Sequence, residues 1–145
     1  MDFVIEIAKP VEQVFALITD LSNYSRWLPP SGLYVTTSSV SDTPIKLGTT
    51  YEDRSNQASL QGSITKYDPP NAVSFHQEMH LRIGRLIVDI AYRLEADGAG
   101  TLVHRTTTPR FSGVVALFGP MVRRSIWAEN RRTLAMMKQY LETQG

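Results

Sequence analysis

Cysteine is missing from the 145 residues of this sequence. Its absence excludes disulfide bonds, thiolate metal sites and cysteine nucleophiles, and it is compatible with a reducing cytoplasm. Long hydrophobic runs are also missing, since no apolar stretch approaches the roughly 20 residues needed to cross a bilayer. The N-terminus lacks a basic region followed by an apolar core and a small-residue cleavage site. We therefore expect no signal peptide, no transmembrane segment and a cytoplasmic location.

A strong charge of either sign is lacking as well. Lys and Arg number 15 against 14 Asp and Glu, which gives a formal net charge of +1. A net charge so close to zero does not by itself imply binding to nucleic acid or to anionic lipid, and we expect no nucleic-acid partner. Hydrophobic residues make up 42% of the sequence, and no linker, repeat or low-complexity tract divides it. We expect one globular domain over residues 1–145.

The most informative stretch that is present runs from Ile7 to Trp27. Residues 2–7 alternate between apolar and polar, which is typical of a half-buried strand. Pro10 suits the first turn of a helix, because its missing N–H would be unpaired there. Apolar residues then recur at helical spacing: Val11, Val14, Phe15 and Ile18. Residues 20–23 break this helix and can cap another, so the sequence predicts a strand followed by a two-helix corner.

Strand-like runs divided by turn signals occupy the middle of the chain. The expected strands are residues 33–40, 47–55, 60–67, 73–81, 86–94 and 101–109. Consecutive prolines at 69 and 70 force one reversal, since proline cannot donate to a strand ladder. The glycines of Asp97-Gly98-Ala99-Gly100 favour a hairpin turn. A long helix follows, after an irregular entry at Gly113 and Pro120, and helices set apart from a continuous antiparallel block indicate an α+β fold.

The last helix has an apolar stripe that can pack on the sheet. At about 100° per residue, the stripe contains Val122, Ile126, Asn130, Thr133, Leu134, Met137, Tyr140 and Leu141. Asn130 is a polar residue at its centre, and a buried amide needs hydrogen-bond partners. Two interpretations stay open: a core amide satisfied by its surroundings, or a polar contact in a ligand cavity.

Several short motifs give the chain a resemblance to a known superfamily. They are Ile7 to Phe15, Asp20 to Trp27, Leu47-Gly48-Thr49, Gly62-Ser63-Ile64, Tyr67-Asp68-Pro69-Pro70, Val73-Ser74-Phe75, Tyr92-Arg93-Leu94 and Gly100-Thr101, followed by the long C-terminal helix. In this order and spacing they resemble the START-like (Bet v 1-like, SRPBCC) superfamily, particularly its bacterial branch of polyketide cyclase/dehydrase and lipid-transport proteins. The resemblance covers the whole chain.

The resemblance implies a helix-grip fold of the α+β class. In that fold a curved antiparallel sheet of about seven strands wraps the C-terminal helix, and two short helices follow the first strand. It also implies a cavity between helix and sheet, where members bind lipids, polyketides, steroids and other hydrophobic molecules. Binding, transport and catalysis all occur on this fold, so the fold does not decide among them.

If the apolar face of the sheet points inward, the side chains on that face line such a cavity. Two central strands then present Phe75, Gln77, Met79, Val88, Ile90 and Tyr92 to the helix. Trp27, at the end of the second short helix, either caps the cavity mouth or plugs the core. Tyr51 either offers its hydroxyl to a ligand or reaches solvent.

The strand at 101–109 leaves two orientations open, because a shift of one residue exchanges its faces. Either Val103, Arg105 and Thr107 point inward, or Leu102, His104, Thr106 and Thr108 do. We favour the first, because related sequences carry apolar residues at that parity. Arg105 would then be a buried guanidinium, which demands a carboxylate, carbonyls or an anionic ligand group. In the other orientation it is solvated outside.

Catalytic and metal-binding motifs are not recognisable. His76 and His80 share a strand face but stand roughly 13 Å apart, too far to bind one ion, and we expect no metal and no cofactor. There is no nucleophile elbow, Walker loop, dinucleotide-binding glycine motif or HExxH pattern. Candidates for a general acid or base are His104, Glu78, Glu129, Arg105 and Tyr92, and no pair of them forms a known motif.

Three functional hypotheses follow. The first is the binding, transport or sequestration of a small hydrophobic or amphipathic molecule, with ligand-binding residues Trp27, Tyr51, Phe75, Gln77, Met79, Ile90, Tyr92, Arg105 and Asn130. The second is a cofactor-independent enzyme of the polyketide cyclase or dehydratase type that uses the same cavity. The third is an interaction protein that works through the basic face of the last helix, which carries Arg124, Arg131, Arg132 and Lys138. A homodimer is compatible with each.

Overall fold

The computed structural model describes residues 1–56 and 58–144. In this part of the chain, seven strands form one antiparallel sheet in the order β1-β7-β6-β5-β4-β3-β2. The strands are β1 (Asp2–Ile7), β2 (Thr36–Ser38), β3 (Thr50–Arg54), β4 (Ser59–Asp68), β5 (Ala72–Leu81), β6 (Gly84–Asp97) and β7 (Gly100–Gly113). The helices are α1 (Val11–Thr19), α2 (Gly119–Thr143) and the short 3-10 helices η1 (Leu21–Arg26) and η2 (Val114–Phe118).

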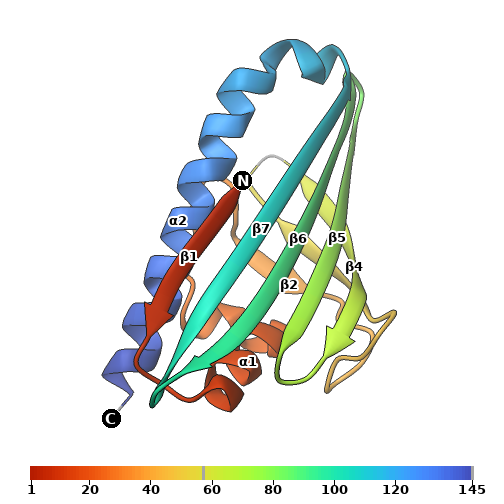
Figure 1. Cartoon of the computed structure of the whole chain (residues 1–145). Coiled ribbons are helices and arrows are strands. Elements are labelled where there is room, and N and C mark those ends of the chain that lie inside the picture. Colours follow the sequence, from red (N-terminus) through yellow and green to blue (C-terminus); the bar gives the residue numbers. More distant parts are fainter. Residues whose placement is uncertain (57, 145) are drawn as a thin grey trace.

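The sheet curves around one side of the long helix α2, and α1 lies at the end where α2 terminates (Figure 1). β1 lies beside α2 at one edge of the sheet, and the short strands β2 and β3 form the other edge. This is the predicted helix-grip arrangement, and the predicted α+β class is confirmed.

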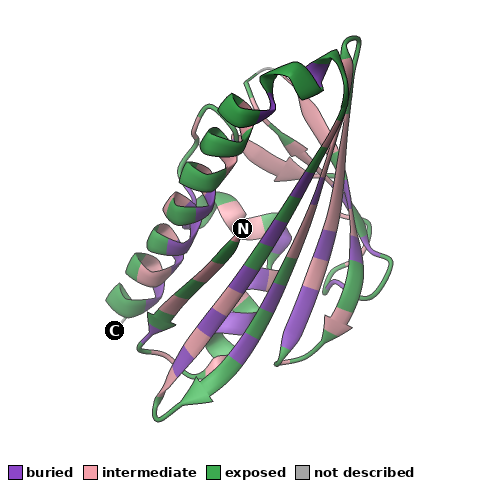
Figure 2. Ribbon diagram, turned by 45° about the horizontal axis from the view of Figure 1, so that its top comes forward, coloured by how far each residue is buried: buried purple, intermediate pink, exposed green. Residues whose placement is uncertain are grey.

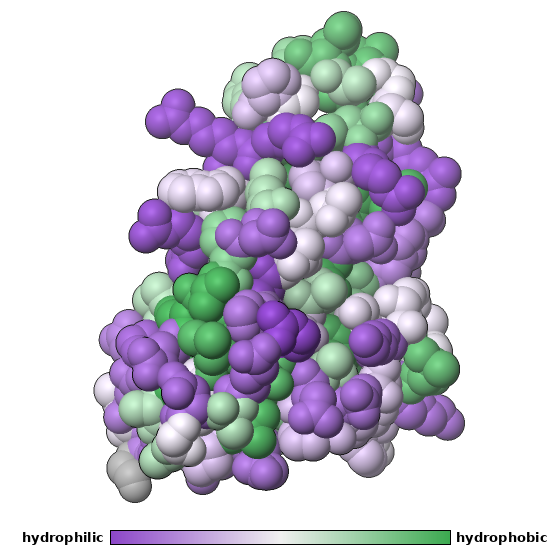
Figure 3. Space-filling model, in the orientation of Figure 1, coloured by the Kyte–Doolittle hydropathy of each residue, from purple (hydrophilic) through white to green (hydrophobic). Residues whose placement is uncertain are grey.

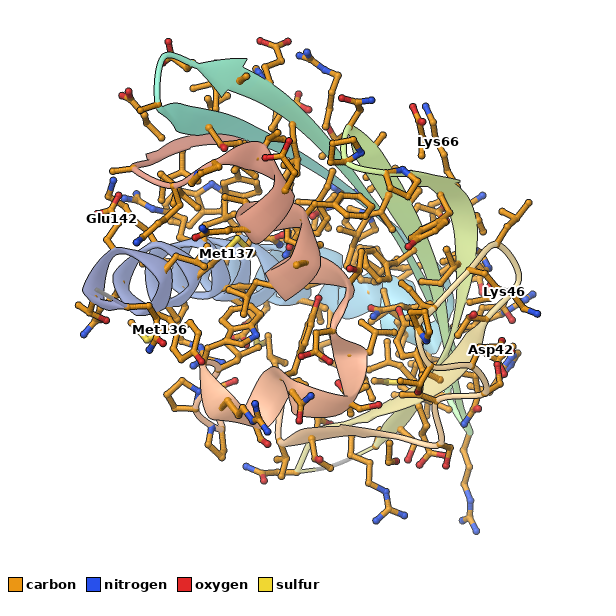
Figure 4. All side chains as sticks on the ribbon, turned by 90° about the horizontal axis from the view of Figure 1, so that it is seen from below. Asp42, Lys46, Lys66, Met136, Met137 and Glu142 are labelled. Atoms are coloured by element: carbon orange, nitrogen blue, oxygen red, sulfur yellow. The ribbon has the colours of Figure 1, made fainter. Side chains whose placement is uncertain are left out.

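Helix α2 turns its predicted apolar stripe toward the sheet. Its buried residues include Asn130, Thr133, Leu134, Met137 and Leu141, while the opposite side of the helix is exposed (Figure 2). Viewed from below, Met137 points from α2 into the enclosed interior, whereas Lys66 lies at the periphery (Figure 4). Although α2 has 25 residues, no helix in the described residues is long and apolar enough to span a membrane.

The two-helix corner closes one end of the core. Pro10 stands just before α1 as its N-cap, and Thr101 Oγ1 on β7 donates a hydrogen bond of 2.7 Å to the Lys9 carbonyl. Trp27 follows η1 and is 5% exposed. Its ring meets that of Tyr24 edge to face, with centroids 4.9 Å apart, so it contributes apolar area to the core.

Strand β7 has the inward parity that the sequence favoured. Val103, Arg105 and Thr107 are buried, whereas His104 lies on the outer face. The strand is longer than expected, continuing to Gly113 rather than ending at Pro109. β1 pairs with β7 only as far as Thr106, so Pro109 lies where β7 has no partner on that side and a missing N–H is tolerated.

Strand β2 is shorter than the expected range 33–40. The hydroxyl oxygen of Ser31 accepts hydrogen bonds from the backbone N–H groups of Leu33 and Tyr34, at 3.2 and 3.1 Å. After this turn the Val35 N–H donates to the Arg54 carbonyl at 2.7 Å, and β2 begins at Thr36. As a result, Tyr34 is free to turn its ring into the interior, where it is 7% exposed.

Candidate functional site

A cavity lies between the concave face of the sheet, η1 and α2. Its volume is about 130 Å3, close to the roughly 150 Å3 of a cavity that holds benzene. The apolar part of its lining consists of Leu21, Leu28, Leu33, Leu60, Phe75 and Ile90. The polar part consists of Tyr24, Tyr34, Thr37, Tyr51, Asp53, Gln77, Tyr92, Arg105, Glu129 and Thr133.

Arg105 is a buried cation on the wall of this cavity, with 8% of the residue exposed. Its Nε donates a hydrogen bond of 2.6 Å to Asn130 Oδ1, and Nη1 donates to the hydroxyl of Tyr92. The guanidinium carbon lies 5.1 Å from the centroid of the Tyr92 ring. Within the described residues no carboxylate forms an ion pair with Arg105, and Nη2 has no hydrogen-bond partner there. Burying a cation without a counter-ion costs free energy that an anionic or carbonyl group in the cavity would offset.

Asn130 is the residue that fixes the position of Arg105. Its Oδ1 accepts from Arg105 and also from Thr107 Oγ1, at 2.6 Å each. Its Nδ2 donates to the Ile126 carbonyl at 2.7 Å, one turn earlier on α2. The amide is therefore satisfied by its surroundings, which is the first of the two interpretations that the sequence left open, and it does not line the cavity.

Asp53 on β3 brings a carboxylate to the same cavity. Thr37 Oγ1 donates to Asp53 Oδ1 at 2.6 Å, and Gln77 Nε2 donates to Oδ2 at 3.0 Å. Because the single proton of Thr37 is directed to Asp53, the Tyr34 hydroxyl 2.8 Å away acts as a donor to Thr37. Burial raises the pKa of Asp53 to about 6, although the hydrogen bonds from Thr37 and Gln77 act in the opposite direction.

Three aromatic rings join the two polar ends of the cavity. Tyr51 and Phe75 meet edge to face with centroids 6.1 Å apart, and Phe75 meets Tyr92 in the same way, also at 6.1 Å. Tyr51 packs over Gly62, where a Cβ would lie only 2.2 Å from the Tyr51 Cζ. A side chain at position 62 would thus displace the ring, so glycine is required for this close approach.

The hydroxyls of Tyr51 and Tyr92 keep their own protons available. Tyr51 accepts a hydrogen bond of 2.9 Å from Gln77 Nε2, and Tyr92 accepts one from Arg105. In the described residues no acceptor takes the proton of either hydroxyl. Burial, followed by the charge of Asp53, raises the pKa of Tyr51, so this hydroxyl remains a donor. Tyr24 differs, because its hydroxyl already donates to the Ile18 carbonyl.

Taken together, these groups make a cavity rich in hydrogen-bond donors, with the carboxyl groups of Asp53 and Glu129 on its wall. Arg105, Tyr92 and Tyr51 can donate to an oxygen atom, and Asp53 can accept or return a proton. Apolar surface from Phe75 and the lining leucines separates them. Such a site suits a small molecule that has an apolar body and a carbonyl or anionic oxygen.

The structure brings together six of the predicted ligand-binding residues and leaves three outside the lining. Tyr51, Phe75, Gln77, Ile90, Tyr92 and Arg105 border the cavity. Trp27 lies in the core, Asn130 lies behind Arg105, and Met79 on β5 is beyond the lining. Asp53 is a cavity residue that was not among those predicted from the sequence. The signal was available, because Asp53 is two residues from Tyr51 on one strand and shares its face.

The histidines and Glu78 lie away from the cavity, on the outer face of the sheet. His76 Nδ1 is 2.6 Å from Asp89, and its Nε2 is 3.2 Å from Glu78. These hydrogen bonds raise the pKa of His76. His104 faces outward, 3.8 Å from Glu95. Among the described residues no group of three or more His, Cys, Asp or Glu could hold a metal ion.

The cations on the basic face of α2 are largely held by intramolecular contacts. Arg132 donates to Glu129 and to the Pro29 carbonyl at 2.7 and 2.8 Å. Lys138 donates to the Glu6 carbonyl and to Glu142. The guanidinium of Arg131 lies over the ring of Trp127, 5.1 Å from its centroid. Because these contacts occupy Arg131, Arg132 and Lys138, the basic face offers less unpaired positive charge to a partner than its composition suggests.

Comparison with known proteins yields one family. The sequence model of the family described as polyketide cyclase / dehydrase and lipid transport matches residues 1–142. No curated protein sequence matches the chain at a significant level.

Solved structures with the same fold have low sequence identity to this chain. A protein from Mesorhizobium loti is 14% identical, with a TM-score of 0.72, and the match covers 100% of this chain and 99% of that one. A conserved protein from Geobacillus kaustophilus is also 14% identical, with a TM-score of 0.74 and coverage of 97% and 93%. The di-domain ARO/CYC protein BexL of the BE-7585A biosynthetic pathway is 19% identical, with a TM-score of 0.69. That match covers 98% of this chain and 46% of BexL. At these identities the likeness shows the fold alone.

Proposed function

The chain belongs to the polyketide cyclase/dehydrase and lipid transport family, and on that premise we propose that it binds a small amphipathic molecule in the cavity. The oxygen-bearing end of this molecule lies at Arg105 and Tyr92, and its apolar body lies against Phe75 and Ile90. The observation that carries the proposal is the buried Arg105 guanidinium, which borders the cavity without a carboxylate partner among the described residues. A ligand oxygen would supply the missing partner.

The hydrogen-bond donors on the cavity wall determine which chemical group of a ligand is recognised. Arg105, Tyr92 and Tyr51 all present N–H or O–H groups, so a carbonyl, carboxylate or phenolate is favoured over a ligand that only donates. The volume of about 130 Å3 accommodates one aromatic ring or a chain of similar bulk. Leu33 borders the cavity and is 42% exposed, so a longer tail would leave the cavity beside it.

Calorimetric titration with three matched probes tests this proposal: phenylacetate, phenylacetone and propylbenzene, which share a ring and differ in oxygen. We expect the wild-type protein to bind the first two more tightly than the third. Arg105→Met should weaken phenylacetate binding by about tenfold or more, since a charged hydrogen bond contributes roughly 1.5–3 kcal/mol. Propylbenzene binding should change little.

A matched control is Arg93→Met, which removes an exposed arginine from the outer face of β6. This control should bind all three probes like the wild type. Equal affinity of the wild type for the three probes, or unchanged phenylacetate binding by Arg105→Met, would contradict the proposal.

A second candidate function is proton transfer on a bound carbonyl compound, and Asp53 is the observation that favours it. A carboxylate with a pKa of about 6 is partly ionised near neutral pH and can act as a general base. A C–H bond beside the carbonyl breaks, its proton passes to Asp53, and the electron pair shifts to the carbonyl oxygen. Arg105 and Tyr92 then stabilise the enolate oxygen.

Exchange of the methylene protons of phenylacetone with deuterated water, followed by NMR, tests this second function. The wild-type protein should accelerate the exchange, and Asp53→Asn should abolish the acceleration. Glu52→Gln is the matched control, because it changes a neighbouring carboxylate that pairs with Arg54 at the surface. No acceleration by the wild type, or equal rates with Asp53→Asn, would leave ligand binding as the function.

A further inference from the structure

Large apolar side chains are exposed at the end of the molecule where the β5–β6 turn, the end of β7 and the start of α2 meet. We call this surface the apolar tip; it consists of Leu81, Ile83, Val114, Leu117, Phe118 and Met121. Leu117 is 78% exposed, Met121 65% and Phe118 49%. Hydrophobic surface gathers at the top of the space-filling view, over the segment where β7 passes into α2 (Figure 3). Contiguous exposed apolar surface of this kind marks an interaction site.

The tip is held together by specific backbone contacts. Gly84 and Gly113 stand opposite each other in the β6–β7 ladder, both with positive φ. A Cβ on Gly84 would lie 2.1 Å from the Ser112 carbonyl oxygen. Beyond this point the Val115 N–H donates to the Ile83 carbonyl at 3.1 Å, and Val115 itself is buried. The turn and η2 therefore form one built surface from two segments far apart in the sequence.

Arginines surround the apolar tip, and acidic residues are absent from its segments. Residues 79–88 and 108–128 contain Arg82, Arg85, Arg110, Arg123 and Arg124 but neither Asp nor Glu. Arg85 pairs with Glu78 and Arg110 with Asp89, at 2.6 and 2.8 Å. The guanidinium of Arg123 lies over Phe111, 5.5 Å from the ring centroid. In the described residues Arg82 and Arg124 form no ion pair, so positive charge remains in excess around the tip.

The positive charge and the exposed apolar groups of the tip together indicate which kind of partner it binds. A second copy docked tip to tip would place these arginines against each other, which like-charge repulsion disfavours. A bilayer that contains anionic phospholipid satisfies both features, because apolar side chains enter the headgroup boundary and arginines reach the phosphates. Each basic residue near such a surface contributes about 1 kcal/mol.

We propose that the apolar tip docks on the surface of an anionic phospholipid bilayer. Leu117, Phe118 and Met121 enter the interface between headgroups and acyl chains, and Arg82, Arg123 and Arg124 contact phosphate groups. The chain lies on the membrane and does not cross it. The proposal is independent of the cavity, since none of these residues borders it.

Flotation with lipid vesicles tests the proposal. The full chain should float with vesicles of phosphatidylcholine mixed with phosphatidylglycerol, should float far less with phosphatidylcholine alone, and should be released by added salt. The variants Leu117→Ser with Phe118→Ser, and Arg123→Glu with Arg124→Glu, should each weaken binding by about tenfold or more. Each alters exposed side chains only, so circular dichroism should show an unchanged fold.

Two control variants separate the tip from the rest of the surface. Val4→Ser changes an apolar residue that is 59% exposed on β1, and Arg131→Glu reverses a charge on α2 outside the tip. Both should float like the wild type. Absence of binding to the mixed vesicles overturns the proposal, as does equal binding by the tip variants. A concentration-dependent dimer in sedimentation that the tip variants abolish also overturns it, because the tip would then be buried between two copies.

Discussion

Replacing Asp53 with asparagine should stabilise the folded protein at neutral pH. The substitution preserves shape, and its hydrogen bonds can be satisfied. Asparagine Oδ1 can accept from Gln77 Nε2, and Nδ2 can donate to Thr37 Oγ1, whose hydroxyl then turns toward Tyr34. What the variant loses is the negative charge that burial disfavours.

The magnitude follows from the pKa of Asp53, which lies at about 6 in the folded protein against an ordinary value of 3.8. Between these two values the folded state binds more protons than the unfolded state. The free energy of unfolding therefore falls as pH rises through this window. One pKa unit corresponds to about 1.4 kcal/mol. At pH values above this window, a shift of about two units therefore lowers the free energy of unfolding of the wild type by at most roughly 3 kcal/mol.

Urea unfolding of both proteins at a series of pH values measures this effect. The free energy of unfolding of Asp53→Asn minus that of the wild type should be near zero at about pH 4 and rise to as much as 3 kcal/mol by about pH 7. Other titrating groups such as His76 are common to both proteins and cancel in this difference. A difference that stays flat across the range would refute the reasoning, because the carboxylate would then cost nothing to bury.

Three further substitutions probe the same cavity. Arg105→Met should change the free energy of unfolding, measured in urea, by less than about 2 kcal/mol, because the lost hydrogen bonds are offset by the removed cost of burying a cation. A loss of roughly 3–5 kcal/mol, as when one partner of a buried ion pair is removed, would instead make Arg105 a structural support. Gly62→Ala should destabilise by about 1–3 kcal/mol, because the new methyl group displaces Tyr51, and an unchanged thermal midpoint would contradict this packing. Asn130→Asp gives Arg105 a counter-ion, so the affinity for phenylacetate in calorimetry should fall by about tenfold, whereas an unchanged affinity would mean that the charge of Arg105 is not used.

Much of the fold could be predicted because buried apolar residues recur at regular spacing in strands and helices. The alternation at Phe75 and Tyr92 indicated two long strands with a common inward face, and the stripe around Met137 indicated a helix packed on them. In these regular elements spacing decides which side chains share a face. On the strand at 101–109 spacing left both faces open, and the apolar parity of related sequences favoured Val103 and Arg105 inside.

The direction of Asp53 follows from that of Tyr51 on the same strand, but the groups around its carboxylate could not be predicted in this way. The surroundings of Asp53 come from Thr37, Gln77 and Tyr34, which lie on separate strands or in a loop. Their approach depends on the curvature of the sheet and on the turn at Ser31, and neither has a periodic signature. The place of Trp27 in the core could not be read from spacing for a similar reason, since the direction of a side chain after a 3-10 helix depends on packing, here against Tyr24.

The central claim is that Arg105 holds the oxygen-bearing end of a small molecule in the cavity. Native mass spectrometry of gently purified wild-type protein and of Arg105→Met, followed by organic extraction of both, tests it most directly. We expect the wild type to retain one small molecule per chain with a carbonyl, carboxylate or phenol group, and Arg105→Met to lose it. A wild-type protein that is empty and gains no thermal stability from any of the three probes would contradict this role of Arg105. Equal retention of the same molecule by both proteins would also contradict it.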